Sequence, residues 1–156
     1  MTHAITLHLT RDHRALARLF AIGVFQAFRA RLLTHIAIEE KLLMPLLADA
    51  GRSPELLASL RADHSALAAL TIPTPRPELV SQIRGILRVH DRLEEGAGGL
   101  YEQCAALAGA RSAGLMRELE AFPLAVPSPH RDGDAIERHI ARSLEHAERL
   151  RVELLR

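Results

Sequence analysis

The sequence predicts an all-α protein, an up-down-up-down antiparallel four-helix bundle followed by additional C-terminal helices. Leu and Ala dominate a chain of 156 residues that is 48% hydrophobic and only 3% aromatic, and both are strong helix formers. Apolar residues recur at steps of three and four along four successive segments, which is the stripe that a bundle helix turns toward its core. Short clusters of proline and glycine separate these segments, and short connections favour antiparallel neighbours.

Turn and capping residues place the helix boundaries. Thr2 is a candidate N-cap for the first helix, and Ser53 followed by proline is one for the third. Pro45 lies inside the second segment, where it should kink the helix or loosen its last turn. Three prolines within five residues form a rigid loop before the fourth helix, and a run of glycines follows that helix. The four predicted helices span residues 3–20, 25–50, 54–70 and 77–95.

The C-terminal third is less regular. Two shorter helical pieces, 101–107 and 112–122, precede a proline-rich linker at 123–133. A last amphipathic helix covers 134–156. We therefore expect a bundle with a short helical extension over residues 1–122, then the linker, then a helix that caps the bundle, pairs two chains as a homodimer, or tethers a partner.

Composition limits the classes of function. The net charge is +1 with acidic and basic residues interspersed, so no basic surface indicates DNA or RNA binding. Cys104 is the single cysteine, which excludes an internal disulfide and fits a reducing compartment. No signal peptide is recognisable, and the longest apolar run is too short to span a bilayer. These features favour a cytoplasmic protein without nucleic-acid or membrane partners.

His35 and Glu39 are four residues apart and lie about 40° from each other on an α-helix. On its own this pair is more often a surface pair than a metal site. Its neighbours place it on a core stripe, where a carboxylate beside an imidazole is costly unless a metal or a specific partner accepts both. The stripe consists of Phe28, Leu32, His35, Glu39, Leu42 and Leu46.

Each of the four predicted bundle helices carries one histidine on its core stripe, and two of them add a carboxylate one turn later. A single core histidine is usually satisfied by a neighbouring side chain. Four of them, one on each helix, favour a metal site formed from all four helices. The candidate metal ligands are His13, His35, Glu39, His64, His90 and Glu94.

This order of residues resembles the H-HxxxE-H-HxxxE signature of the hemerythrin-like HHE cation-binding domains. Local sequence agrees, including Asp12-His13-Arg14, Met44-Pro45 and Asp63-His64. The similarity covers about residues 3–107. It implies a non-haem di-iron centre inside a four-helix bundle, with two iron ions, bridging carboxylates and an oxo or hydroxo bridge, and it assigns the six candidate residues as the ligands.

Two positions depart from the oxygen-carrying members of that family. Ala68 stands where the carriers have a second histidine one turn after the third-helix ligand. The carriers also place the last carboxylate five residues after its histidine, which here is Glu95. Helical geometry favours Glu94, about 40° from His90, over Glu95, about 140° away, although a π-bulge would reverse that preference.

The resemblance and the ligand count suggest a function. Four imidazoles and two bridging carboxylates make about eight protein contacts, roughly four for each iron against an octahedral six. With one shared oxygen bridge, each iron keeps an open position. We expect binding or sensing of oxygen, nitric oxide or peroxide, or iron handling, and a metal-binding or sensor protein rather than a dedicated enzyme.

Two other classes remain open. Hemerythrin-like members with four histidines and two glutamates are linked to iron–sulfur cluster repair under nitrosative stress, but they usually carry an additional cysteine-bearing N-terminal domain that this sequence does not contain. A metal-free structural or interaction bundle is the other alternative. A ferritin-like oxidase is excluded because the chain contains no E-x-x-H pair.

Several residues near the candidate ligands receive weaker predictions. Tyr101 lies seven residues after Glu94 and could reach the site or donate a hydrogen bond near it, but a partly buried tyrosine at a helix end is the commoner case. Asp12 and Asp63 directly precede ligands and should lie about 100° off the core face. Cys104 is expected to be a small buried hydrophobe.

Overall fold

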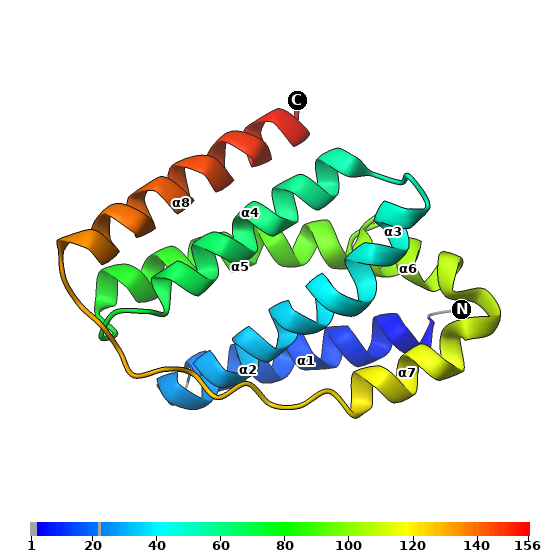
Figure 1. Ribbon diagram of the computed structural model, residues 1–156, viewed down its shortest axis with the longest axis horizontal. Helices are drawn as coiled ribbons and strands as arrows, with labels where there is room; N and C mark the ends of the chain where they lie inside the picture. The colour runs from blue at the N-terminus through cyan, green and yellow to red at the C-terminus, as the bar shows by residue number, and fades with distance from the viewer. Residues whose placement is uncertain (1–2, 22) are drawn as a thin grey trace. The chain divides into compact units, whose positions relative to one another are not determined.

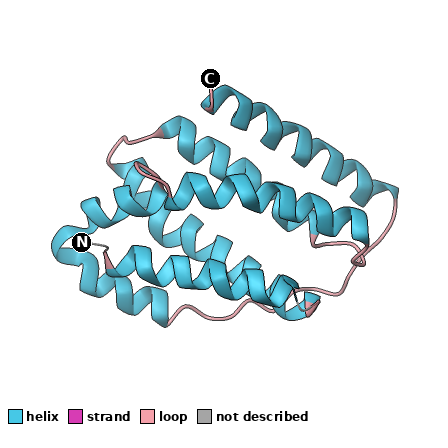
Figure 2. Cartoon of the chain, turned by 180° about the vertical axis from the view of Figure 1, so that it is seen from behind, coloured by secondary structure: helices cyan, strands magenta, loops and turns pink. Residues whose placement is uncertain are grey.

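The computed structural model describes residues 3–21 and 23–156. These residues form helices joined by loops and contain no strand (Figures 1 and 2). The predicted all-α class is confirmed, a helical bundle with an additional C-terminal helix. The proposed N-cap Thr2 lies outside the described residues. Within those residues, no helix has both the length and the apolar character needed to cross a membrane.

The chain forms two compact units. The first comprises residues 1–52 and 91–127, and the second comprises residues 53–90 and 128–156. Helix α5 supplies residues to both, because it runs from Pro77 to Glu95. The first unit also contains α1 (Ala4–Ala21), α2 (Phe25–Ile38), the π-helical segment η1 (Glu39–Leu43), α3 (Met44–Asp49), α6 (Leu100–Ala108), the short turn η2 (Gly109–Arg111) and α7 (Ser112–Glu120). The second also contains α4 (Pro54–Leu70) and α8 (Asp134–Leu154).

Helices α1 and α2 pack side by side as a hairpin in the first unit (Figure 1). Gly23 in the connection has φ of 72°, a conformation that glycine adopts without the steric cost of a side chain. Near this turn the rings of Phe20 and Phe28 pack with centroids 4.7 Å apart. One face of α1 is buried, with Ile5, Leu9 and Leu16 at most 3% exposed.

The second predicted helix is a rod of three segments, α2, η1 and α3. The π-helical turn is closed by the Met44 N–H, which donates to the carbonyl of Glu39 five residues earlier. Pro45 follows directly, within the first turn of α3. Proline lacks an N–H and its ring collides with the carbonyl four residues back in a regular α-helix. The wider π turn before Pro45 is the loosening that this proline was expected to cause.

The π turn changes which side chains reach the core. Leu42 and Leu46 were predicted on the core stripe, and this prediction is wrong because both are only half-buried. Leu43 and Leu47, one residue later, are fully buried instead. A π turn contains one more residue than an α turn, so the apolar face after Glu39 moves forward by one position.

In the second unit, α8 lies along α4 (Figure 1). Ile140 and Ala147 bury the inner face of α8. The boundaries of α4 agree with the prediction, and its stripe is buried through Thr71. Ser53 occupies the N-cap position, but it has a left-handed backbone (φ 48°, ψ 51°) and its side chain makes no capping hydrogen bond. Asp132, which lies just before α8, accepts hydrogen bonds from the N–H and the hydroxyl of Thr74 in the α4–α5 loop. These bonds fix the start of α8 to that loop.

A glycine turn separates α5 from α6. Gly98 has φ of 73°. A Cβ atom on Gly99 would lie 2.6 Å from the carbonyl oxygens of both Leu93 and Glu94. No residue with a side chain fits this close approach of backbone to backbone. The turn ends α5, and α6 begins directly after it at Leu100.

Candidate metal centre

Four of the six predicted ligands converge in the first unit. These four residues are His13, His35, Glu39 and Glu94, which come from three helices and the start of the π turn. Each offers one potential ligand atom, and these four atoms all lie within 4.8 Å of one another. All are buried: His13 is 8% exposed, His35 2%, and Glu39 and Glu94 0%. Burying two carboxylates beside two imidazoles is costly without a cation to share them.

The Nδ1 atom of each of the two imidazoles, His13 and His35, contacts a carboxylate. The Nδ1 of His13 lies 2.6 Å from Glu95 Oε1, and the Nδ1 of His35 lies 2.8 Å from Asp12 Oδ2. An ionised carboxylate only accepts hydrogen bonds, so the Nδ1 of each ring carries the hydrogen. Such outer carboxylates orient metal-binding histidines and increase the basicity of the inner nitrogen. Arg31 fixes Asp12 in turn, with its Nε 2.6 Å from Oδ1.

The inner nitrogens of these two rings face each other. The Nε2 atoms of His13 and His35 are 2.8 Å apart. With both Nδ1 hydrogens directed outward, two neutral rings would bring two lone pairs together at this distance. A cation between them, either a proton or a metal ion, removes the repulsion. The pair is therefore built around a positive charge.

The electrostatics of the rings agree with this geometry. Burial alone would lower the pKa of His13, but the hydrogen bond and negative charge of Glu94 reverse the effect and raise it. Burial would likewise lower the pKa of His35, but Glu39, Asp12 and Glu94 raise it well above its usual value. Without a metal, these rings hold a proton, and a metal ion would have to displace it.

Tyr101, from the first turn of α6, reaches the centre of this cluster. Its side chain is 0% exposed. Its hydroxyl lies 2.6 Å from Glu39 Oε1 and 3.1 Å from Glu94 Oε2. Burial and the two carboxylates raise its pKa well above the usual value, so the phenol is a neutral donor. The sequence favoured a partly buried tyrosine at a helix end; Tyr101 does lie at the start of α6, but it is fully buried and contacts the candidate ligands.

The other two predicted ligands lie in the second unit. The rings of His64 on α4 and His90 on α5 have centroids 4.9 Å apart. The Nδ1 of His90 lies 3.2 Å from Asp63 Oδ2. Asp63 is 0% exposed, and its other oxygen lies 3.3 Å from the Nε of Arg151 on α8. His90 therefore has an outer carboxylate, as His13 and His35 do.

The sequence prediction missed these outer carboxylates. Asp12 and Asp63 were placed off the core face beside their sequence neighbours, yet each pairs with the histidine of the following bundle helix. Glu95, considered from the sequence as an alternative ligand, instead accepts from His13. The Asp-His dipeptide that occurs before both H-x-x-x-E pairs was the available signal.

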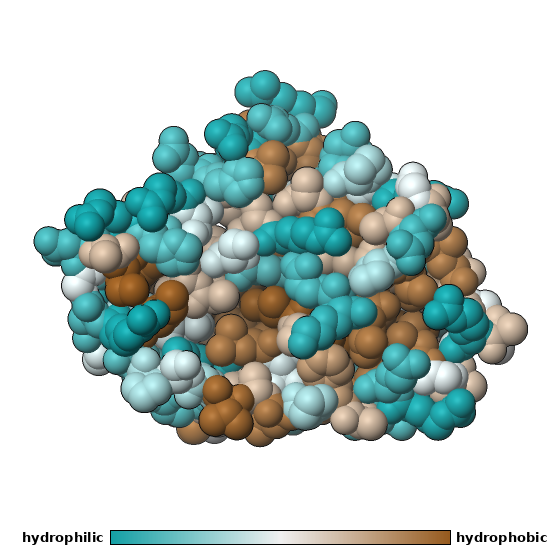
Figure 3. All heavy atoms as spheres, in the orientation of Figure 1, coloured by the Kyte–Doolittle hydropathy of each residue, from teal (hydrophilic) through white to brown (hydrophobic). Residues whose placement is uncertain are grey.

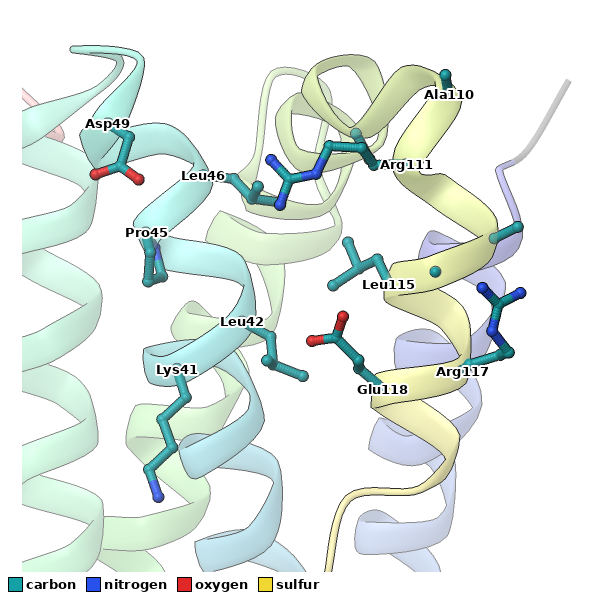
Figure 4. A pocket seen from close by; sticks show the side chains of 13 residues that line it. Lys41, Leu42, Pro45, Leu46, Asp49, Ala110, Arg111, Leu115, Arg117 and Glu118 are labelled. Carbon is teal, nitrogen blue, oxygen red and sulfur yellow. The ribbon is translucent and has the colours of Figure 1, made fainter.

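A separate groove of about 500 Å³ lies in the first unit between η1–α3 and α7. Leu42 and Leu46 point into it from one side and Leu115 from the other (Figure 4). Hydrophobic surface is visible over this region in Figure 3. No histidine lines the groove, so it is distinct from the ligand cluster. It receives the two leucines that the π turn removes from the core.

Comparison with known proteins agrees with the site. The model of the hemerythrin HHE cation-binding domain matches residues 4–142, which is most of the chain and extends beyond the region of resemblance seen in the sequence. No curated protein and no solved structure matches the chain. Clusters of buried histidine and glutamate side chains that could hold a metal ion, in an all-helical chain, fit the cation binding for which this family is described. The chain therefore belongs to the hemerythrin HHE cation-binding domain family.

Proposed function

We propose that this protein binds two iron ions with an oxo or hydroxo bridge through His13, His35, Glu39, His64, His90 and Glu94, and that the centre binds or senses oxygen, nitric oxide or peroxide, or takes part in iron handling. The observation that carries the proposal is the pair of Nε2 atoms of His13 and His35, 2.8 Å apart with both Nδ1 atoms turned to carboxylates. This arrangement provides two neutral nitrogen donors for one cation.

The donor set fits iron. Imidazole nitrogens combined with carboxylate oxygens suit first-row metals such as iron, whereas thiolate ligands would indicate a softer metal. The lone cysteine, Cys104, hydrogen-bonds to the carbonyl of Leu43, and its sulfur belongs to neither group of candidate ligands. Its pKa is raised to about 12, chiefly by burial and also by Glu39, so it remains a thiol.

The protein residues supply orientation and charge. Asp12, Glu95 and Asp63 hold the Nδ1 sides of three histidines, which keeps the opposite nitrogens available as donors. Two buried glutamates add the negative charge that a pair of metal ions would neutralise. Iron bound there would supply reversible binding of a small oxygen or nitrogen ligand. Ala68 in place of a fifth histidine favours sensing or iron handling over oxygen carriage.

Metal content tests the proposal directly. Purified protein should contain two irons per chain, and Glu39→Ala or His64→Ala should abolish stoichiometric iron. His146→Ala removes an exposed histidine of α8 and should leave the iron content unchanged. Two irons retained in both ligand variants would exclude the assignment. No bound metal, with helicity unchanged by a chelator, would support the metal-free bundle instead, and zinc alone would contradict the assignment of iron.

Ligand binding needs its own measurement. Anaerobic titration of the reduced, iron-loaded protein with nitric oxide, and of the oxidised protein with peroxide, should change the optical spectrum with a saturable dependence. An iron-loaded protein whose spectrum responds to neither compound nor to oxygen would contradict the sensing role and leave iron handling.

A further inference from the structure

The hydroxyl of Tyr101 lies among the four converging candidate ligands. Besides the two glutamates, it lies 3.0 Å from His13 Nε2 and 3.3 Å from His35 Nε2. One oxygen atom is therefore within hydrogen-bond distance of a ligand atom from all four residues. Donor atoms around a first-row metal lie about 2.0–2.2 Å from the ion. A metal ion held by these four side chains would therefore have the phenol oxygen close by.

The tyrosine cannot leave the cluster easily. Its side chain is 0% exposed, and its ring centroid lies 5.6 Å from that of His13. The start of α6 is fixed by the glycine turn, in which the Gly98 N–H donates to Glu102 Oε2 at 2.6 Å. One turn later, the Cys104 thiol donates to the Leu43 carbonyl at 3.4 Å. A small shift that turns the phenol oxygen into a ligand needs less rearrangement than expelling the ring.

We propose that Tyr101 is an additional protein ligand, bound as a phenolate to the metal ion held by His13, His35, Glu39 and Glu94. The inference rests on the proposed metal-binding function. On binding, the phenol O–H bond breaks, a metal–oxygen bond forms, and the proton leaves to solvent with no change in oxidation state. Tyr101 then fills one of the positions that the six-ligand count leaves open. Phenolate is a hard anionic donor, so it favours the ferric over the ferrous ion at this position.

The composition of the chain makes this proposal testable without an activity assay. Tyr101 is the single tyrosine and the chain has no tryptophan. Any tyrosinate signal in the full-length protein therefore has one origin. The chelator-treated protein is titrated with Ga³⁺, a colourless trivalent ion, and separately loaded with iron in air. Metal content is measured on each sample alongside its spectrum.

The expected result is a tyrosinate difference spectrum in the near ultraviolet with Ga³⁺ and a visible phenolate-to-iron charge-transfer band with iron. Phenolate vibrations in the resonance Raman spectrum should shift when the protein is produced with ring-deuterated tyrosine. Tyr101→Phe should lose all these signals and bind metal about tenfold or more weakly, a loss at least as large as that from removing an outer carboxylate. Cys104→Ser, on the same helix, should retain the signals.

The outcomes separate the two proposals. Bound metal without tyrosinate signals overturns the assignment of Tyr101 and leaves metal binding intact. Absence of bound metal overturns the proposed function and this inference together. Should Tyr101→Phe fail to fold, the isotope shift in the wild-type protein decides the question, because a band that does not respond to deuterated tyrosine excludes phenolate ligation.

Discussion

Gly99→Ala should destabilise the protein and displace Tyr101, although Gly99 touches no ligand. The added Cβ would lie 2.6 Å from the carbonyl oxygens of Leu93 and Glu94 and 2.8 Å from that of Gly96. These are backbone atoms, so no side chain can rotate away. Ordinary contact begins at 3.4 Å, which requires the turn to open by about 0.8 Å.

The cost follows from what the turn positions. Tyr101 is two residues away, and a shift of this size would lengthen its 3.1 Å hydrogen bond to Glu94 beyond bonding distance. A hydrogen bond to a charged group contributes about 1.5–3 kcal/mol. Backbone strain adds about 1 kcal/mol. We therefore expect a loss of about 2.5–4 kcal/mol in the free energy of unfolding, the sum of these terms.

Urea unfolding followed by circular dichroism measures the stability, and the fluorescence of the single tyrosine reports its environment. Gly98→Ala is a matched control, since its φ of 73° carries strain but a Cβ there meets nothing within 4 Å. It should cost about 1–2 kcal/mol and leave tyrosine emission unchanged. Gly85→Ala, exposed within α5, should stabilise by about 0.5–1 kcal/mol. A Gly99→Ala protein with wild-type stability and tyrosine emission would show that the close backbone contacts of Gly99 do not position Tyr101.

Three further predictions test other contacts. Asp12→Asn should weaken metal binding about 10–100-fold, because the Nδ1 of His35 loses a charged acceptor. Competition with a coloured chelator measures the affinity, and an unchanged affinity would argue against the outer-carboxylate role of Asp12. Arg151→Ala removes the cation beside the buried Asp63 and should lower the free energy of unfolding by about 1–3 kcal/mol, measured by thermal or urea unfolding. The control Arg149→Ala, at an exposed position on the same helix, should change it by no more than about 0.5 kcal/mol. The pKa of Cys104 is raised from 9.0 to about 12, so folding disfavours the thiolate form. The resulting contribution of Cys104 to the free energy of unfolding is present below about pH 9 and is lost as the pH rises toward 12. At pH 8, alkylation of the native thiol should be about a thousandfold slower than in urea-unfolded protein, and equal rates would exclude the raised pKa.

Much of the architecture could be predicted because helical stripes and turn residues act locally. The boundaries of α4 and the burial of all six candidate ligands follow from a period of about 3.6 residues and from proline at a helix start. Glu94 is 0% exposed whereas Glu95 lies toward the surface, in line with their angular separation from His90. Local rules were sufficient wherever the helix remained regular.

The missed features depend on irregular backbone or on contacts between helices. A π turn shifts the stripe by one residue, and periodicity alone cannot show where such a turn lies. Tyr101 reaches the candidate ligands from α6, which begins after the turn at Gly98 and Gly99, and this turn interrupts the helical register that follows α5. Asp12 is off the core face of its own helix, yet that position faces the histidine of the next one.

The π turn also has a consequence for how the sequence of this rod can change over time. The segment before Glu39 presents a candidate ligand face, and the segment after it presents Leu42 and Leu46 to the groove. One added residue rotates these segments by about 100° relative to a continuous α-helix. Substitutions in the groove can therefore accumulate without altering the ligand face. Loss of the one extra residue between Glu39 and Pro45 would give a continuous α-helix in which Leu43 and Leu47 keep the core face. Straightening the turn at constant length would instead bring Leu42 and Leu46 to the core.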